Sequence, residues 1–122
     1  MKRLPDAEFD IMKVIWDNEP PITTSLIMQQ LGNSKEWKAQ TIISLMLRLV
    51  ERGFVRTEKN GKIRNYFPLI SEEEYLNFEA KGFMKRFHFN SFTSMVSQLY
   101  DGTKIKSEDL DELEKWLKEK KE

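Results

Sequence analysis

The stretch that decides the fold is WKAQTIISLMLRLVERGFVRTEKNGKIRNYFP, residues 37–68. Its first part, residues 39–52, spaces apolar residues as an amphipathic helix does, and Gly53 is a typical helix stop. Its second part alternates polar and apolar residues over 54–58 and 63–67, on either side of KNGK, and Asn-Gly is a strong signal for a tight hairpin turn. We therefore expect a helix that leads directly into a β-hairpin.

Two further helices are expected before this stretch. Residues 6–18 carry a broad apolar stripe, and the Pro20-Pro21 pair ends the helix that this stripe predicts. Thr23 or Thr24 can cap a second helix that runs to Gly32, and Ile22 can add a short third strand to the hairpin. The order helix, helix, helix, hairpin is that of a winged helix-turn-helix. This is a mainly α (α+β) fold with a small three-stranded sheet, and we expect it to cover residues 1–70.

Residues 71–122 are predicted to be helical. Ser71 to Glu74 match a capping box, and two further helices are expected near residues 91–100 and 107–120. This region holds more large apolar side chains than its own helices could cover. They either pack onto the first domain or form a subunit interface, and we favour a helical dimerisation domain. Its predicted interface residues are Phe78, Phe83, Phe87, Phe92, Met95, Val96, Leu99, Leu110, Leu113, Trp116 and Leu117.

Positive charge is concentrated in one part of the chain. The formal net charge is zero, with 20 basic and 20 acidic residues, yet residues 1–70 carry 11 Lys and Arg against 8 Asp and Glu. Between residues 35 and 66, eight basic residues accompany only three acids. Such a stripe is the electrostatic footprint of nucleic-acid binding. The eight are Lys35, Lys38, Arg48, Arg52, Arg56, Lys59, Lys62 and Arg64.

The non-core face of the predicted helix 39–52 offers side chains that can read bases. Gln can pair with adenine through two hydrogen bonds, Thr and Ser can donate or accept, and an exposed Ile43 can cover a thymine methyl group. Later arginines and the basic hairpin would hold phosphates. A merely solvated face is the alternative, and Ile43 or Leu47 could instead be partly buried. The predicted DNA-binding residues are Lys38, Gln40, Thr41, Ile43, Ser44, Arg48, Arg52, Lys59, Lys62 and Arg64.

Several functional classes are not expected. Cys is absent, so thiolate metal sites and disulfides are excluded, and the single His88 cannot form a histidine metal cluster. No phosphate loop, nucleophile elbow or metal motif occurs, and the acid clusters suit helix starts and solvated surface. We therefore predict no enzyme, no cofactor and no small-molecule ligand. The N-terminus lacks a secretory pattern and no apolar run could cross a membrane, so we expect a cytoplasmic protein.

Several of these segments together resemble the penicillinase-repressor (BlaI/MecI) family. They are LPDAEFDIMKVIW at residues 4–16, Trp37 with Thr41-Ile42, LVERGFV at 49–55, Tyr66, and the acidic SEDLDEL at 107–113. The similarity spans nearly the full length. It implies a homodimeric repressor that binds a palindromic operator in double-stranded DNA and controls β-lactamase or related antibiotic-resistance genes. It also implies relief of repression when a membrane sensor metalloprotease cleaves the C-terminal region, at a position matching Gln98-Leu99.

The chain departs from that family at three points. Lys38-Ala39 stand where the family usually has a Ser or Thr cap and often Pro, and Ile43 stands where a basic residue can occur. Gln98-Leu99 replaces the usual Asn-Phe pair at the cleavage position. A copper-responsive branch senses metal through C-terminal cysteines, which this chain lacks. The alternative function is a protein-interaction module in which the Phe-rich C-terminal helices recruit a partner.

Overall fold

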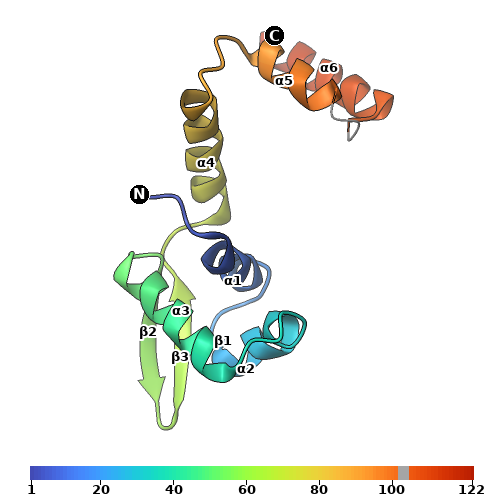
Figure 1. The fold of residues 1–122 in the computed structure, drawn as a ribbon. Coiled ribbons are helices and arrows are strands. Elements are labelled where there is room, and N and C mark those ends of the chain that lie inside the picture. Colours follow the sequence, from blue (N-terminus) through green and yellow to red (C-terminus); the bar gives the residue numbers. More distant parts are fainter. Residues whose placement is uncertain (102–104) are drawn as a thin grey trace. The chain divides into compact units, whose positions relative to one another are not determined.

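The computed structural model describes residues 1–101 and 105–122. It is mostly helical with one small antiparallel sheet, which confirms the predicted fold class (Figure 1). The elements in chain order are α1 (Asp6–Trp16), β1 (Ile22–Thr23), α2 (Thr24–Ile27), the π-helical turn η1 (Met28–Gly32), α3 (Ala39–Glu51), β2 (Val55–Asn60), β3 (Ile63–Pro68), α4 (Glu72–Arg86), α5 (Phe92–Asp101) and α6 (Ser107–Lys121).

The sheet has the strand order β1-β3-β2, so the short strand at Ile22 does join the hairpin as predicted. The turn itself differs from the expected one. Asn60 pairs with Ile63 and belongs to β2, which leaves Gly61 and Lys62 as the two turn residues. Only Gly61 has a positive φ, at 67°. This is the pattern of a type II′ turn, with glycine in the first central position, and not of an Asn-Gly turn in which both residues have positive φ.

One continuous apolar core holds α1, α2, α3 and the sheet together. Because α3 buries a complete stripe, its rotation about its own axis is fixed, and its opposite face is left to solvent. Each fully buried large side chain contributes roughly 1.5–3 kcal/mol relative to exposure. The buried apolar residues are Leu4, Ile11, Met12, Ile15, Ile22, Ile27, Ile42, Leu45, Met46, Leu49, Phe54, Val55, Tyr66 and Tyr75.

Local hydrogen bonds explain where helices begin. Thr23 caps α2, since its Oγ1 accepts from the N–H of Leu26 at 3.2 Å. Ser71 and Glu74 form the predicted capping box at the start of α4: Ser71 Oγ accepts from the Glu74 N–H at 3.1 Å, and Glu74 Oε1 accepts from the Ser71 N–H at 3.3 Å. Both predictions from sequence are confirmed.

The ends of α3 and α4 share one geometry. Gly53 and His88 each follow the helix with positive φ, 81° and 56°, and the next residue donates back to the carbonyl five residues earlier. These bonds run from Phe54 to Leu49 at 2.9 Å and from Phe89 to Met84 at 3.1 Å. This is a Schellman motif, which favours glycine. His88 is exposed, and its positive φ turns the chain away from α4 after Arg86.

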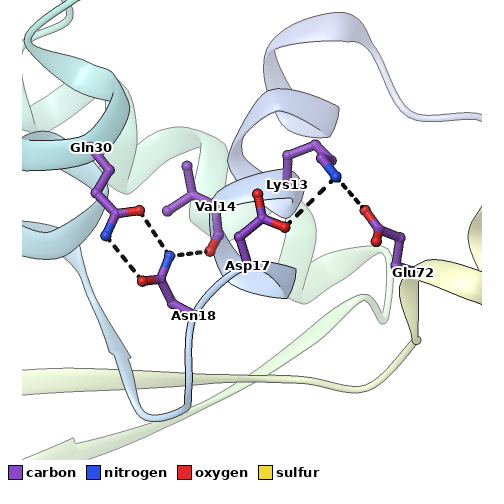
Figure 2. Close-up of polar contacts among 6 residues, drawn as sticks. All are labelled: Lys13, Val14, Asp17, Asn18, Gln30 and Glu72. Carbon is purple, nitrogen blue, oxygen red and sulfur yellow. Dashed lines mark hydrogen bonds and ion pairs between the residues drawn. The ribbon is translucent and has the colours of Figure 1, made fainter.

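Two polar ties fasten α1 to its neighbours (Figure 2). At its end, Asn18 and Gln30 exchange a pair of amide hydrogen bonds of 2.8 and 3.0 Å, which joins α1 to η1. Lys13 donates to Glu72 Oε2 at 2.6 Å and also pairs with Asp17 at 3.7 Å. The hydrogen bond to Glu72 raises the pKa of Lys13. The start of α4 is thus attached to α1 by a charged pair as well as by apolar packing.

The chain forms two compact units, Met1–Glu79 and Ala80–Glu122. The first contains the winged helix-turn-helix together with the first turns of α4. In the second, α5 and α6 face each other across an apolar hollow of about 470 Å³, and Phe83 stacks on Phe89. Among the described residues, no helix has the length and apolar character that a bilayer crossing requires.

Candidate nucleic-acid interface

The exposed face of α3 is the centre of the candidate site. With Ile42, Leu45, Met46 and Leu49 turned into the core, the side chains between them must point outward. The structure accordingly leaves all the predicted base-reading residues accessible. The exposed residues of this face are Gln40, Thr41, Ile43, Ser44, Leu47 and Arg48.

Ile43 and Leu47 both lie outside the core, and each is partly covered by its neighbours, as the sequence left open. Ile43 is 44% accessible and Leu47, one turn later, is 58% accessible. Two large apolar side chains on an otherwise polar face are costly to hydrate. The surface they form suits a partner that presents methyl groups or other apolar edges, as a thymine does in the major groove.

Lys38 occupies the N-cap position of α3. Its backbone is extended, with φ −84° and ψ 158°, and its side chain makes no capping hydrogen bond. A Ser or Thr here would accept from a free N–H of the first turn. This chain instead places a cation beside the helix N-terminus, which is the unfavourable sign for the helix dipole. The arrangement becomes favourable only when an anion lies nearby.

The hairpin carries the second part of the site and projects beyond α3 (Figure 1). Lys59 on β2 lies directly opposite Arg64 on β3, and Lys62 stands in the turn between them. Like charges directly opposite each other across two strands destabilise the hairpin. Arg64 also donates to Thr57 Oγ1 at 3.4 Å, a long contact that leaves its charge uncompensated. A phosphate bound near these cations would relieve their repulsion.

Ion pairing separates the eight basic residues of this region into two groups. Lys35 pairs with Asp10 at 3.4 Å, Arg52 with Glu8 at 2.8 Å, and Arg56 with Glu58 at 2.6 Å. The structure, over the residues it describes, gives the other five no ion pair with a carboxylate. Those five, which we call the unpaired cations, are Lys38, Arg48, Lys59, Lys62 and Arg64.

A hollow of about 300 Å³ connects α3 with the hairpin. Ile43 lines it from α3, while residues 62–64 line it from the hairpin. Its third wall is the start of α2, where Thr24 and Ser25 supply hydroxyl groups. These two residues were not predicted from the sequence. The available signal was the run of three hydroxyl residues at the start of α2, because the first helix of a helix-turn-helix crosses the DNA backbone.

The predicted interface residues fall into the two units. Phe78 packs against Tyr75 in the core of the first unit, with ring centroids 6.1 Å apart, which is the alternative that the sequence left open for it. In the second unit, Met95, Val96, Leu110 and Leu113 are half-buried. The remaining predicted residues are exposed, namely Phe83, Phe87, Phe92, Leu99, Trp116 and Leu117.

Gln98 and Leu99 lie within α5, three and two residues before its end at Asp101, and both are exposed. Their peptide bond is therefore helical. No cluster of three or more potential metal-binding side chains occurs in residues 1–101 and 105–122.

Comparison with known proteins finds relatives that match nearly the full length of the chain. The family model described as penicillinase repressor matches residues 4–119. The penicillinase repressor of Bacillus licheniformis is 32% identical, over 99% of this chain and 96% of that protein. The methicillin resistance regulatory protein MecI of Staphylococcus aureus is 26% identical, over 96% of this chain and 94% of that protein.

Two solved structures resemble the chain. The DNA-binding domain of the repressor BlaI matches with a TM-score of 0.53 and 35% identity, covering 62% of this chain and 94% of that domain. The monomeric form of Bacillus licheniformis BlaI in complex with the blaP half-operator matches with a TM-score of 0.51 and 34% identity, covering 61% of this chain and 89% of that one.

Proposed function

The chain belongs to the penicillinase repressor family, and from that premise we propose that it is a DNA-binding transcriptional repressor that acts as a homodimer on a palindromic operator. One observation carries the DNA-binding part. The base-reading face of α3 and the unpaired cations of the hairpin share a surface through the hollow that Ile43, Lys62 and Arg64 line. A recognition helix flanked by free cations is what a duplex requires, because phosphates hold the protein while base edges select the sequence.

Specificity is assigned to the early residues of α3. Gln40, Thr41 and Ser44 would bind base edges, and Ile43 would contact a thymine methyl group. The unpaired cations (Lys38, Arg48, Lys59, Lys62 and Arg64) would bind phosphates. Thr24 and Ser25 are added to this set as hydroxyl donors to the backbone. We propose no DNA contact for Arg52, because its guanidinium is paired with the Glu8 carboxylate through Nε.

Dimerisation is assigned to the second unit. Several large apolar side chains there remain exposed, which favours their burial against a second copy. Two copies related by a two-fold axis would present two α3 helices to successive major grooves, and this matches a palindrome. We propose that residues 1–70 carry the DNA-binding surface and residues 71–122 the dimerising one, with the first turns of α4 packed into the core of the former.

The regulated genes are proposed from the relatives. Their names refer to penicillinase repression and methicillin resistance, so this chain is proposed to control a β-lactamase or a related resistance gene. Relief of repression by a membrane sensor metalloprotease follows from the family alone. Because the bond between Gln98 and Leu99 is helical, its cleavage would require local unwinding of α5.

The deciding experiment combines DNA selection with a salt titration. The full chain is used to select duplexes from a random pool, and affinity for the selected duplex is then measured from low to moderate salt while the oligomeric state is followed by sedimentation. A repressor should select a palindrome, bind it as a dimer, and lose affinity steeply as salt rises, because phosphate contacts release counterions. A monomer that selects no sequence would instead support the protein-interaction module.

A further inference from the structure

The core of the winged unit contains one buried charge whose role is unassigned. Glu8, in the first turn of α1, is only 1% accessible. Its Oε1 accepts a hydrogen bond from Nε of Arg52 at 2.8 Å. Its Oε2 is the one buried side-chain polar atom, among the residues described, that lacks a hydrogen-bond partner.

A buried acid with one oxygen left without a hydrogen bond lowers the stability of the fold, and an apolar residue of similar volume would often give equal or greater stability. Such a group therefore calls for an explanation other than stability.

Arg52 shows what the buried acid holds. It is the C-cap residue of α3, directly before Gly53, where the backbone turns at a φ of 81°. The pair thus joins the first turn of α1 to the end of α3. Buried apolar residues of both helices also share one core, and apolar contacts are not directional. A hydrogen-bonded ion pair has a defined length and angle, so it can fix how far α3 is advanced along its own axis.

The position of α3 along its axis matters at its other end. Gln40, Thr41 and Ser44 lie in the first two turns, and any shift of the helix moves them relative to base edges. Hydrogen bonds to bases depend on tenths of an ångström. Arg48, one turn before Arg52, has an exposed side chain without an ion pair in the described structure, so phosphate binding does not need Arg52.

We propose that Glu8 and Arg52 act together as a positioning pair that fixes the position of α3 along its own axis, and that Arg52 is not a phosphate ligand. The proposal rests on the DNA-binding function proposed above and deepens it. It also replaces the phosphate contact that the sequence suggested for Arg52. Glu8 and Arg52 would influence operator affinity without touching DNA.

The test uses the full chain and the duplex selected by the wild type. Glu8→Gln, Arg52→Gln and the double variant are compared for affinity over a salt series, well below their melting temperatures. Each single variant should bind roughly tenfold more weakly, about the loss expected for one misplaced base contact. The salt slope should stay unchanged, and the double variant should be no weaker than either single one, because both changes remove the same constraint.

Two control variants define the alternatives. Arg48→Ala should lower the salt slope by about one, as expected for a lost phosphate contact. Glu72→Gln breaks the matched ion pair between Lys13 and Glu72, which joins α1 to α4 instead of α3, and should leave operator affinity unchanged. Arg52→Lys keeps the charge but loses the planar guanidinium, so it should behave as Arg52→Gln does. It also serves if the glutamine variants fold poorly.

Three results would overturn the positioning role. Arg52→Gln could lower the salt slope by about one while Glu8→Gln binds as well as or better than the wild type, which would make Arg52 a phosphate ligand. The variants could melt earlier yet bind the operator with unchanged affinity, which would make the pair structural only. Arg52→Lys could bind as the wild type does. A wild-type chain that binds no duplex would instead remove the proposed function itself.

Discussion

The hydroxyl of Tyr75 accepts a hydrogen bond from the backbone N–H of Leu4 at 2.7 Å. The same hydroxyl donates to Oε2 of Glu79 at 3.0 Å. Tyr75 stands in the first turn of α4, yet it is fully buried, so α4 begins inside the core of the winged unit. The rings around it belong to Phe9, Trp16, Phe54 and Phe78, with centroids 5.5–6.1 Å away.

The fragment of residues 1–79 should therefore fold cooperatively, whereas the fragment of residues 1–70 should be largely unfolded. Removing a buried aromatic side chain costs about 3–5 kcal/mol, a large share of the roughly 5–15 kcal/mol that stabilises a domain. Thermal unfolding followed by circular dichroism measures the difference. Leu76→Ala in the longer fragment is the control for losing a large side chain of α4. Leu76 is exposed beside Tyr75, so its removal should leave the melting temperature nearly unchanged. Equal melting temperatures for the two fragments would refute the role given to Tyr75.

Tyr75 should also make stability sensitive to alkaline pH. Burial of its ring, partly offset by the hydrogen bond from Leu4, raises its pKa to about 12. The unfolded chain has the ordinary value of about 10. The neutral phenol is thus favoured in the fold, and its contribution is complete below pH 10 and is lost as pH rises towards 12.

Tyr75→Phe tests this by comparison with the wild type. At pH 8 the variant should be less stable by roughly 0.5–2 kcal/mol, because the Leu4 N–H loses its partner. Above pH 10 the gap between the two unfolding free energies should shrink, while lysine titration affects both proteins alike. Urea unfolding at a series of pH values measures the gap, and a gap that stays constant from pH 8 to 11 would count against the assignment.

The sequence predicted the fold well wherever local pattern decides the outcome. The apolar spacing of residues 39–52 predicted which face of α3 is buried, and Gly53 predicted where the helix ends. The hairpin was predicted, but its turn was displaced by one residue, because cross-strand pairing extends β2 through Asn60 and overrides the Asn-Gly preference.

Two features of the winged unit depended on contacts between distant residues and could not be predicted. Glu8 is one acid among several near the N-terminus, and only the folded chain places it beside Arg52, 44 positions later. Tyr75 follows three glutamates, a pattern typical of a solvated helix start, so its burial was hidden. The aromatic richness after residue 70 was interpreted as interface, although Phe78 packs on the winged core.

Thr41 and Arg48 should separate sequence reading from phosphate binding. Thr41→Ala should reduce affinity for the selected operator by roughly 1–3 kcal/mol for each lost base contact and change binding to random DNA little. Arg48→Ala should weaken binding to both kinds of DNA and lower the salt slope by about one. Fluorescence anisotropy with operator and random duplexes measures both effects. If Thr41→Ala lost equal affinity on the two duplexes, the assignment of Thr41 to a base would be wrong.

Lys38→Ser should have opposite effects on stability and on DNA binding. A serine at this N-cap can accept from a free N–H of the first turn of α3, which stabilises a helix by about 0.5–2 kcal/mol relative to alanine. The loss of the cation should lower the salt slope for the operator by about one. Lys38→Ala is the control, since it removes the charge without adding a cap. In thermal unfolding the serine variant should melt above the alanine variant, whereas in the salt titration both variants should show the same lowered slope relative to the wild type. A serine variant that melts no higher than the alanine variant would contradict the capping argument.

Leu99→Glu should separate dimerisation from the folding of the second unit. Leu99 is 50% accessible on α5, so a carboxylate there leaves the monomer unharmed. In a dimer that buries this side chain, the unpaired charge would be desolvated at a cost of several kcal/mol. We expect sedimentation to show a shift towards monomer, with weaker binding to the full palindrome and unchanged binding to a half-site. Gln98→Glu places the same charge on the neighbouring exposed residue and should leave the dimer intact. If Leu99→Glu remained dimeric at the same concentration, this face of α5 would lie outside the interface, and the pairing of two α3 helices would have to come from other residues of the second unit.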